Sequence, residues 1–119
     1  MSWNYRIVHH KEKNGEELKL RAWDKINKRM IYIESFSQIP SNWKDVWILM
    51  LFTGKHGMLG IEVFDGDKVA WMHKGSIIEG IIYWSDYMWM VKDVRGGNAT
   101  RLGKVNIIRV IGNIYEGGE

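Results

Sequence analysis

The stretch that decides the fold is FDGDKVAW (residues 64–71), which is followed after a short polar break by GIIYW (residues 80–84). In the first segment a Gly-Asp pair turns the backbone directly into a run of β-branched and aromatic residues, and Gly80 opens a second such run. Two runs of this kind joined by short turns predict a hairpin of a small β-barrel.

Strand periodicity continues on the N-terminal side of this stretch. Residues 4–10 and 17–23 alternate in polarity on either side of an Asn-Gly turn signal, and residues 29–34 alternate again after a polar turn at 24–28. Alternation with a period of two is typical of strands that have one face buried. The first third of the chain is therefore predicted to be a three-stranded meander.

The middle and the C-terminal part of the chain extend this pattern. Residues 37–45 contain the only proline and are predicted to be irregular, with Ser41 capping one short helical turn that runs through Val46. A buried strand is predicted at residues 46–52, followed by a glycine-rich loop from Gly54 to Gly60. The remaining predicted strands are residues 61–64, 68–73, 76–84, 87–94 and 105–111.

These elements predict a single all-β domain spanning residues 1–119. We expect a small barrel, SH3-like or OB-like, or two packed sheets, made of short antiparallel strands with at most one short helical turn. Seven Trp, five Tyr and three Phe among 119 residues exceed what one small core is expected to absorb. Some of these rings should therefore lie at a subunit interface or on a binding surface.

Composition narrows the functional classes. The chain has no cysteine, which excludes disulfides, thiolate metal sites and cysteine nucleophiles. No apolar run reaches the length of a signal peptide core or a membrane span, so we expect a cytoplasmic protein that does not contact membranes. A net charge of +3 permits a polyanionic partner, but the basic residues of this chain are not clearly clustered in its sequence.

Residues with catalytic chemistry are few and lack supporting context. His9 and His10 are adjacent, so on a strand they point to opposite faces and cannot share one metal ion. Asp65 and Asp67 flank a tight turn, where carboxylates are usually solvated or bonded to backbone amides. The serines stand in no nucleophile motif. We expect no catalytic residue, no metal and no cofactor, and hence no enzyme.

The strongest candidate for ligand binding is the glycine-rich run at residues 93–104. Glycine allows backbone amides to approach phosphate oxygens, and cations surround the run, although it lacks the Gly-Lys-Ser/Thr ending of a P-loop. Aromatic side chains on nearby strands could stack on exposed bases. The alternatives are a plain hairpin connection and rings that are packed in the core. The candidate nucleic-acid-binding residues are Lys92, Arg95, Arg101, Lys104 and Arg109 for phosphates, with Trp84 and Trp89 for bases.

Four segments resemble successive landmarks of the YopX family of phage and prophage proteins: residues 20–30 (LRAWDKINKRM), 49–54 (LMLFTG), 64–69 (FDGDKV) and 110–116 (VIGNIYE). The resemblance covers residues 18–116, and residues 1–17 look like an N-terminal hairpin extension. It implies an all-β fold, a phage or prophage origin, action in the cytoplasm of the bacterial host and self-association. The chain has KHGMLG (residues 55–60) where relatives have an Asp-rich stretch, which argues against a cation site there.

Two functional hypotheses follow. In the first, the chain is a non-enzymatic phage accessory protein that assembles into homo-oligomers through aromatic faces and binds a host or phage macromolecule. In the second, it is a small barrel that binds nucleic acid through the basic glycine-rich loop and the surface aromatic residues.

Overall fold

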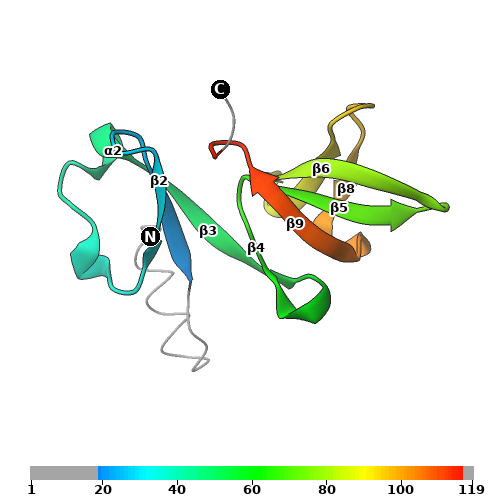
Figure 1. Cartoon of the computed structure of the whole chain (residues 1–119), viewed down its shortest axis with the longest axis horizontal. Helices are drawn as coiled ribbons and strands as arrows, with labels where there is room; N and C mark the ends of the chain where they lie inside the picture. The colour runs from blue at the N-terminus through cyan, green and yellow to red at the C-terminus, as the bar shows by residue number, and fades with distance from the viewer. Residues whose placement is uncertain (1–18, 117–119) are drawn as a thin grey trace.

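The computed structural model describes residues 19–116 and confirms the all-β class (Figure 1). All strand pairs in this part of the chain are antiparallel. The strands are β1 (Leu20–Asp24), β2 (Arg29–Ile33), β3 (Trp47–His56), β4 (Glu62–Phe64), β5 (Asp67–His73), β6 (Ser76–Ser85), β7 (Met88–Asp93), β8 (Ala99–Arg101) and β9 (Ile107–Asn113).

The first sheet has the order β2-β1-β3-β4 and forms one side of the molecule in Figure 1. Strand β3 is long enough to pair with β1 through its first half and with β4 through its second half, with an irregular register between Phe52 and His56. A small apolar cluster centred on Leu20, Ala22 and Ile33 lies on this sheet. The helical turn α2 (Trp43–Val46) leads into β3.

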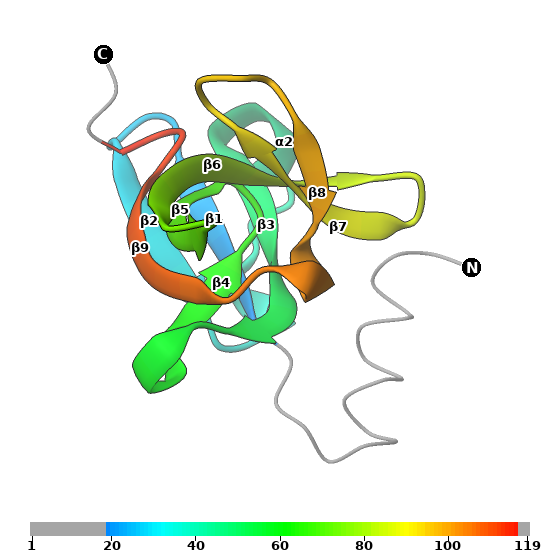
Figure 2. The ribbon, with the colours of Figure 1, turned by 90° about the vertical axis from the view of Figure 1, so that its right-hand side faces the viewer.

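The second sheet has the order β8-β7-β6-β5-β9, and Figure 2 shows it curled like half of a barrel. Its concave face holds the larger core, made of Val63, Val69, Trp71, Ile82, Val91, Leu102, Val105 and Ile107. Gly80 is required at the centre of this sheet, because an added Cβ would lie 2.7 Å from the Lys92 carbonyl oxygen and 2.9 Å from the Trp71 ring. Val63 of β4 belongs to this core, so the first sheet helps to cover the second.

A buried ion pair joins the two sheets, and we call its surroundings the junction (Arg21, Phe64, Asp65, Gly66, Asp67, with Trp23 and Tyr115 beside them). Arg21 of β1 is 4% exposed and donates from Nη2 to Asp67 Oδ1 at 2.6 Å and to the Asp65 carbonyl oxygen at 3.3 Å. Its guanidinium carbon lies 4.5 Å from the centre of the Phe64 ring. Asp67 Oδ2 accepts from the Phe64 amide at 2.7 Å, the kind of backbone bond expected of a turn carboxylate.

The C-terminal segment closes over the junction. The Ile114 amide donates to the Gly66 carbonyl oxygen at 3.0 Å, and the Tyr115 ring stacks on Trp23 with centroids 6.0 Å apart. Burial raises the pKa of the Asp65 carboxyl, an effect that Arg21 opposes and the Asp67 charge reinforces. Burial also raises the pKa of Tyr115, and the Asp65 charge adds to it.

The structure corrects several local predictions. The cap of the helical turn is Asn42 rather than Ser41, and it makes no side-chain capping bond. The strand predicted to end at Phe52 continues to His56, because Gly54 with φ of +88° accommodates the irregular register. Three 3₁₀ turns, η1 (Phe36–Gln38), η2 (Met58–Gly60) and η3 (Leu102–Lys104), add to the single α-helical turn that was predicted. The predicted hairpin of residues 1–17 lies outside the described residues.

Most other predictions of strands agree with the structure to within a few residues. The turn at 24–28 is built as predicted, since Asp24 Oδ1 accepts from the Ile26 and Asn27 amides at 3.0 and 3.1 Å. Of the predicted three-stranded meander, β1 and β2 do form a hairpin, and the strand predicted at residues 4–10 lies outside the described residues. The other edge of β1 is paired with β3. Within residues 19–116, no helix has the length and apolar character needed to cross a membrane.

Candidate nucleic-acid interface

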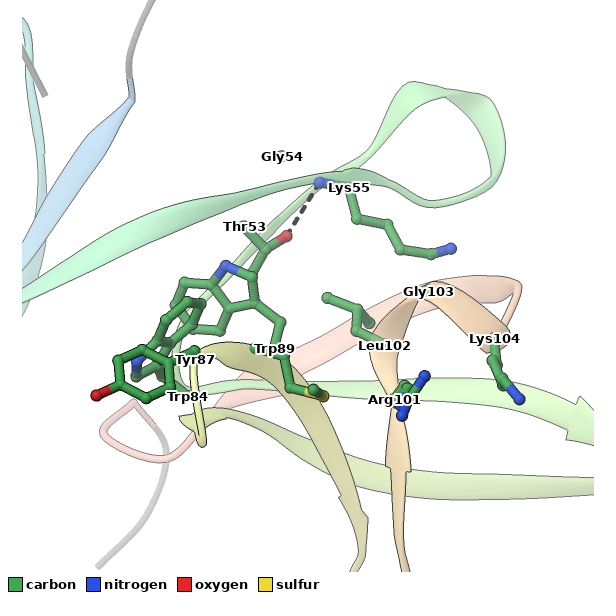
Figure 3. A pocket seen from close by; sticks show the side chains of 11 residues that line it. Thr53, Gly54, Lys55, Trp84, Tyr87, Trp89, Arg101, Leu102, Gly103 and Lys104 are labelled. Carbon is green, nitrogen blue, oxygen red and sulfur yellow. Dashed lines mark hydrogen bonds between the residues drawn. The ribbon is translucent and has the colours of Figure 1, made fainter. Parts of the chain in front are cut away.

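An open groove of about 680 Å³ lies between the second half of β3, the tip of the β6–β7 hairpin and η3. Figure 3 shows the side chains that line it. They are Thr53, Gly54, Lys55, Trp84, Tyr87, Met88, Trp89, Arg101, Leu102, Gly103 and Lys104.

Three aromatic rings gather at one end of the groove (Figure 3). Trp84 and Trp89 are direct partners across β6 and β7, and their rings meet edge to face with centroids 5.1 Å apart and planes at 72°. Trp89 is half-buried against the larger core, whereas Trp84 is 53% exposed. Tyr87, at the tip of the hairpin, is 92% exposed. The core therefore anchors one ring, which in turn supports a second ring that is open to a ligand.

Cationic side chains occupy the rest of the groove. Arg101 ends β8 and Lys104 ends η3, and between them Leu102 is buried in the larger core, which fixes this wall (Figure 3). Lys55 stands on the opposite wall, on β3. Its backbone amide donates to Thr53 Oγ1 at 3.1 Å, and that hydroxyl donates to the Val63 carbonyl oxygen at 2.7 Å.

The charges on the described lining residues have one sign. Within residues 19–116, three cations and no carboxylate line the groove. Among the described residues, none of the three cations forms an ion pair. Like charges around a concave surface attract anions, and flat exposed rings stack on flat ligands. The site suits a ligand that carries both anionic groups and planar rings.

The structure brings together four of the seven residues predicted to bind nucleic acid: Trp84, Trp89, Arg101 and Lys104. The other three cations lie elsewhere. Lys92 pairs with Ile81 and Ala99 in the sheet, Arg109 pairs with Ala70 on β9, and Arg95 lies in the β7–β8 loop. Grouping them with Arg101 followed their proximity in sequence, but they stand at positions of the sheet and the loop that do not line the groove.

Two of the lining residues that were not predicted, Lys55 and Tyr87, carry a charge or a ring that a ligand could contact, and the reasons for missing them differ. Lys55 is distant in sequence from the predicted set and reaches the groove only through the tertiary fold. Tyr87 was predicted as the first residue of a strand and was not included among the candidate site residues. In the structure Tyr87 lies instead in the two-residue turn, at a position where glycine is usual.

The sequence predicts that backbone amides of the glycine-rich run (residues 93–104) can bind a phosphate. In the structure, several of these amides are bonded to Asp93 instead. Asp93 Oδ1 accepts from the Arg95 amide at 2.8 Å and from the Gly96 amide at 3.3 Å. The Gly97 amide donates to the Asp93 carbonyl oxygen at 3.0 Å. The loop folds around its own aspartate, so these donors are used internally and the carboxylate adds a negative charge beside them.

No group of three or more His, Asp or Glu side chains that could hold a metal ion occurs within residues 19–116. His9 and His10 lie outside this range. His56 packs edge to face on Phe52, with centroids 5.3 Å apart.

Neither a scan against protein-family models nor a search of curated proteins finds a match to this chain.

Proposed function

We propose that this protein is a non-enzymatic binding protein and that its groove holds an unpaired stretch of nucleic acid. One observation carries the proposal: the tertiary fold joins Trp84 and Tyr87 at one end of the groove with Arg101, Lys104 and Lys55 along the rest, and no acid among the described residues lines it. Small barrels bind single strands by this combination, in which rings stack on bases and cations follow the backbone.

The direct test measures binding of fluorescently labelled single-stranded DNA and RNA, and of duplex DNA, by anisotropy over a range of about 50–200 mM salt. Three cations that neutralise phosphates of a single strand give a slope of about −2 for log K against log[salt], since each contributes about 0.7. We expect single strands to bind more tightly than the duplex. Absence of binding, or affinity that does not change with salt, would refute the proposal.

A matched pair of tryptophan variants tests the stacking surface. Trp84→Ala removes the open ring and is expected to weaken single-strand binding about tenfold, because one base stacked on an aromatic ring contributes about 1–3 kcal/mol. Trp43→Ala removes a half-buried ring on α2, outside the groove, and serves as the control. Equal losses in the two variants would show that the effect is one of folding and not of the groove.

The resemblance to the YopX family supports a setting for this activity. We propose that the chain is an accessory protein of a phage or prophage and acts in the cytoplasm of the bacterial host. The four segments that carry the resemblance supply Arg21, Met50, Asp67 and Tyr115 to the junction or its surroundings, whereas the rings of the groove lie outside them. The resemblance therefore concerns the scaffold and not the rings of the groove.

Self-association is a second proposal, and it has its own observation. Met72 and Ile77 face each other across β5 and β6, are 54% and 51% exposed, and lie away from the groove. Neighbouring apolar side chains on a strand surface can be covered by a second copy of the chain. Analytical ultracentrifugation at several concentrations tests this proposal, with Met72→Lys expected to shift the equilibrium toward monomer. A strict monomer at every concentration would contradict it.

A further inference from the structure

The turn that carries Tyr87 has an unusual residue at its second position. Trp84 pairs with Trp89 and Ser85 with Met88, so Asp86 and Tyr87 form a two-residue hairpin turn. Both have positive φ, +52° for Asp86 and +66° for Tyr87. Turns with two positive φ angles favour Asn-Gly or Asp-Gly, because glycine has no Cβ to clash. This turn has the usual aspartate followed by a tyrosine.

The other end of β6 provides a comparison inside the same molecule. His73 pairs with Ser76, which leaves Lys74 and Gly75 as a two-residue turn with φ of +49° and +82°. The two turns therefore share their backbone form. The turn remote from the groove has glycine at the second position, and the turn at the groove has tyrosine there.

No contact within residues 19–116 compensates for the strain at Tyr87. Its side chain is 92% exposed, and it makes no ring contact or hydrogen bond with another described residue. A bulky residue held in the left-handed region without packing contributes nothing to stability, and such outliers gather at functional sites. Its ring lies at the aromatic end of the groove near Trp84 (Figure 3).

We infer that Tyr87 is a binding residue that covers the second face of a base stacked on Trp84, so that the groove selects bases that are unstacked from their neighbours. This inference rests on the function proposed for the groove. A base inside a duplex has both faces occupied by adjacent bases, and only an extruded or single-stranded base can enter between two rings. Trp84 is held edge to face by Trp89, so it forms the fixed side, and Tyr87 forms the outer side.

The test replaces the tyrosine with the residue that the turn favours. Tyr87→Gly is expected to raise Tm by about 4 °C, because the strain is relieved. The same substitution should weaken binding of single-stranded DNA about tenfold and bring it closer to the affinity for duplex. Gly75→Tyr is the matched control, and it should lower Tm at the other turn without changing affinity.

The outcomes distinguish a failure of the proposed function from a failure of the role inferred for Tyr87. If the unmodified protein binds no single strand, the proposed function fails. If it binds and Tyr87→Gly keeps full affinity and the preference for single strands, the groove stands and the role of Tyr87 is overturned. If Tyr87→Gly loses affinity but Tm falls instead of rising, the loss reflects a damaged hairpin, and the inference is likewise overturned.

Discussion

Arginine occurs in two opposite settings in this molecule, the junction and the groove. At the junction Arg21 is nearly inaccessible and is held by Asp67 at 2.6 Å, by the Asp65 carbonyl oxygen and by the face of Phe64. In the groove Arg101 is exposed and, with Lys104 and Lys55, has no carboxylate partner among the described residues. The same type of side chain serves the fold in one place and is left open to a ligand in the other.

The difference follows from the cost of removing a charge from water. A buried cation must be compensated by an anion and by hydrogen bonds that the fold itself supplies. A cation at the surface keeps its water until an anion displaces it, so it contributes little to stability and can contribute to binding. Substitutions at the junction should therefore change the free energy of unfolding, and substitutions in the groove should change the affinity for nucleic acid.

Removing the anion of the junction should have the largest effect. Asp67→Ala leaves Arg21 buried without a counter-charge and removes the acceptor of the Phe64 amide, so we expect the free energy of unfolding to fall by about 3–5 kcal/mol. Urea denaturation measures it. Asp45→Ala, at an exposed carboxylate on α2, should change stability by less than about 0.5 kcal/mol. A similar loss of unfolding free energy in both variants would show that the buried ion pair of the junction is not especially important for stability.

Removing cations from the groove should weaken binding and leave stability nearly unchanged. The double variant Arg101→Gln, Lys104→Gln should reduce the magnitude of the salt slope by about 1.4 and weaken single-strand binding roughly tenfold. Stability should change by less than about 0.5 kcal/mol, because neither side chain has an ion-pair partner among residues 19–116. Anisotropy and thermal denaturation measure the two quantities.

The matched control for this variant comes from the same stretch of sequence. Lys92→Gln with Arg95→Gln removes two cations that lie outside the groove. It should leave the salt slope close to that of the unmodified protein. If this control reduces the slope as much as the groove variant does, the ligand follows the glycine-rich loop and not the groove.

Much of the fold was predictable because its signals are local. Alternating side chains and polar turns located the strands, and the Gly66-Asp67 turn marked the start of β5. The strand order was not predictable, since β1 pairs with β3 through contacts between distant segments. The partner of Arg21 could not be found from periodicity either, because Asp67 is 46 residues away.

The candidate site was only partly predictable for the same reason. Trp84 and Trp89 could be placed near each other because the sequence predicts a short connection between the two strands that carry them. Lys92 was grouped with Arg101 by proximity along the chain, yet its direct partner on β8 is Ala99. Lys55 entered the site through the length of β3, which ran past the predicted break at Gly54. Such contacts depend on register, which local patterns do not specify.

Thr53 could affect both binding and stability, because it lines the groove and also makes two hydrogen bonds within the fold. Thr53→Val removes a hydroxyl that donates to Val63 and accepts from the Lys55 amide, so stability should fall by about 1 kcal/mol. Single-strand affinity should change less than in the Arg101 and Lys104 variant. Thr100→Val on β8, a half-buried threonine outside the groove, is the control. A larger loss of affinity than of stability would make Thr53 a binding residue.

The smallest expected effect concerns Asp65, the neighbour of Asp67 at the junction. Burial raises the pKa of its carboxyl in the folded state, so the folded protein takes up this proton more readily than the unfolded chain does. The ionised carboxyl therefore reduces stability near neutral pH, and this penalty disappears as the pH falls through the folded pKa toward the ordinary value of 3.8.

Asp65→Asn should consequently increase the free energy of unfolding at pH 7, by about 0.5 kcal/mol, the scale of substitutions that break no bond of the fold. The gain should shrink as the pH is lowered and vanish below the unfolded pKa, as measured by urea denaturation over a pH series. Asp67→Ala and Asp65→Asn would then move stability in opposite directions at pH 7, although the two residues are separated only by Gly66. A loss of stability in Asp65→Asn at pH 7 would mean that its carboxylate supports Arg21 as Asp67 does, and the junction would have two anions instead of one.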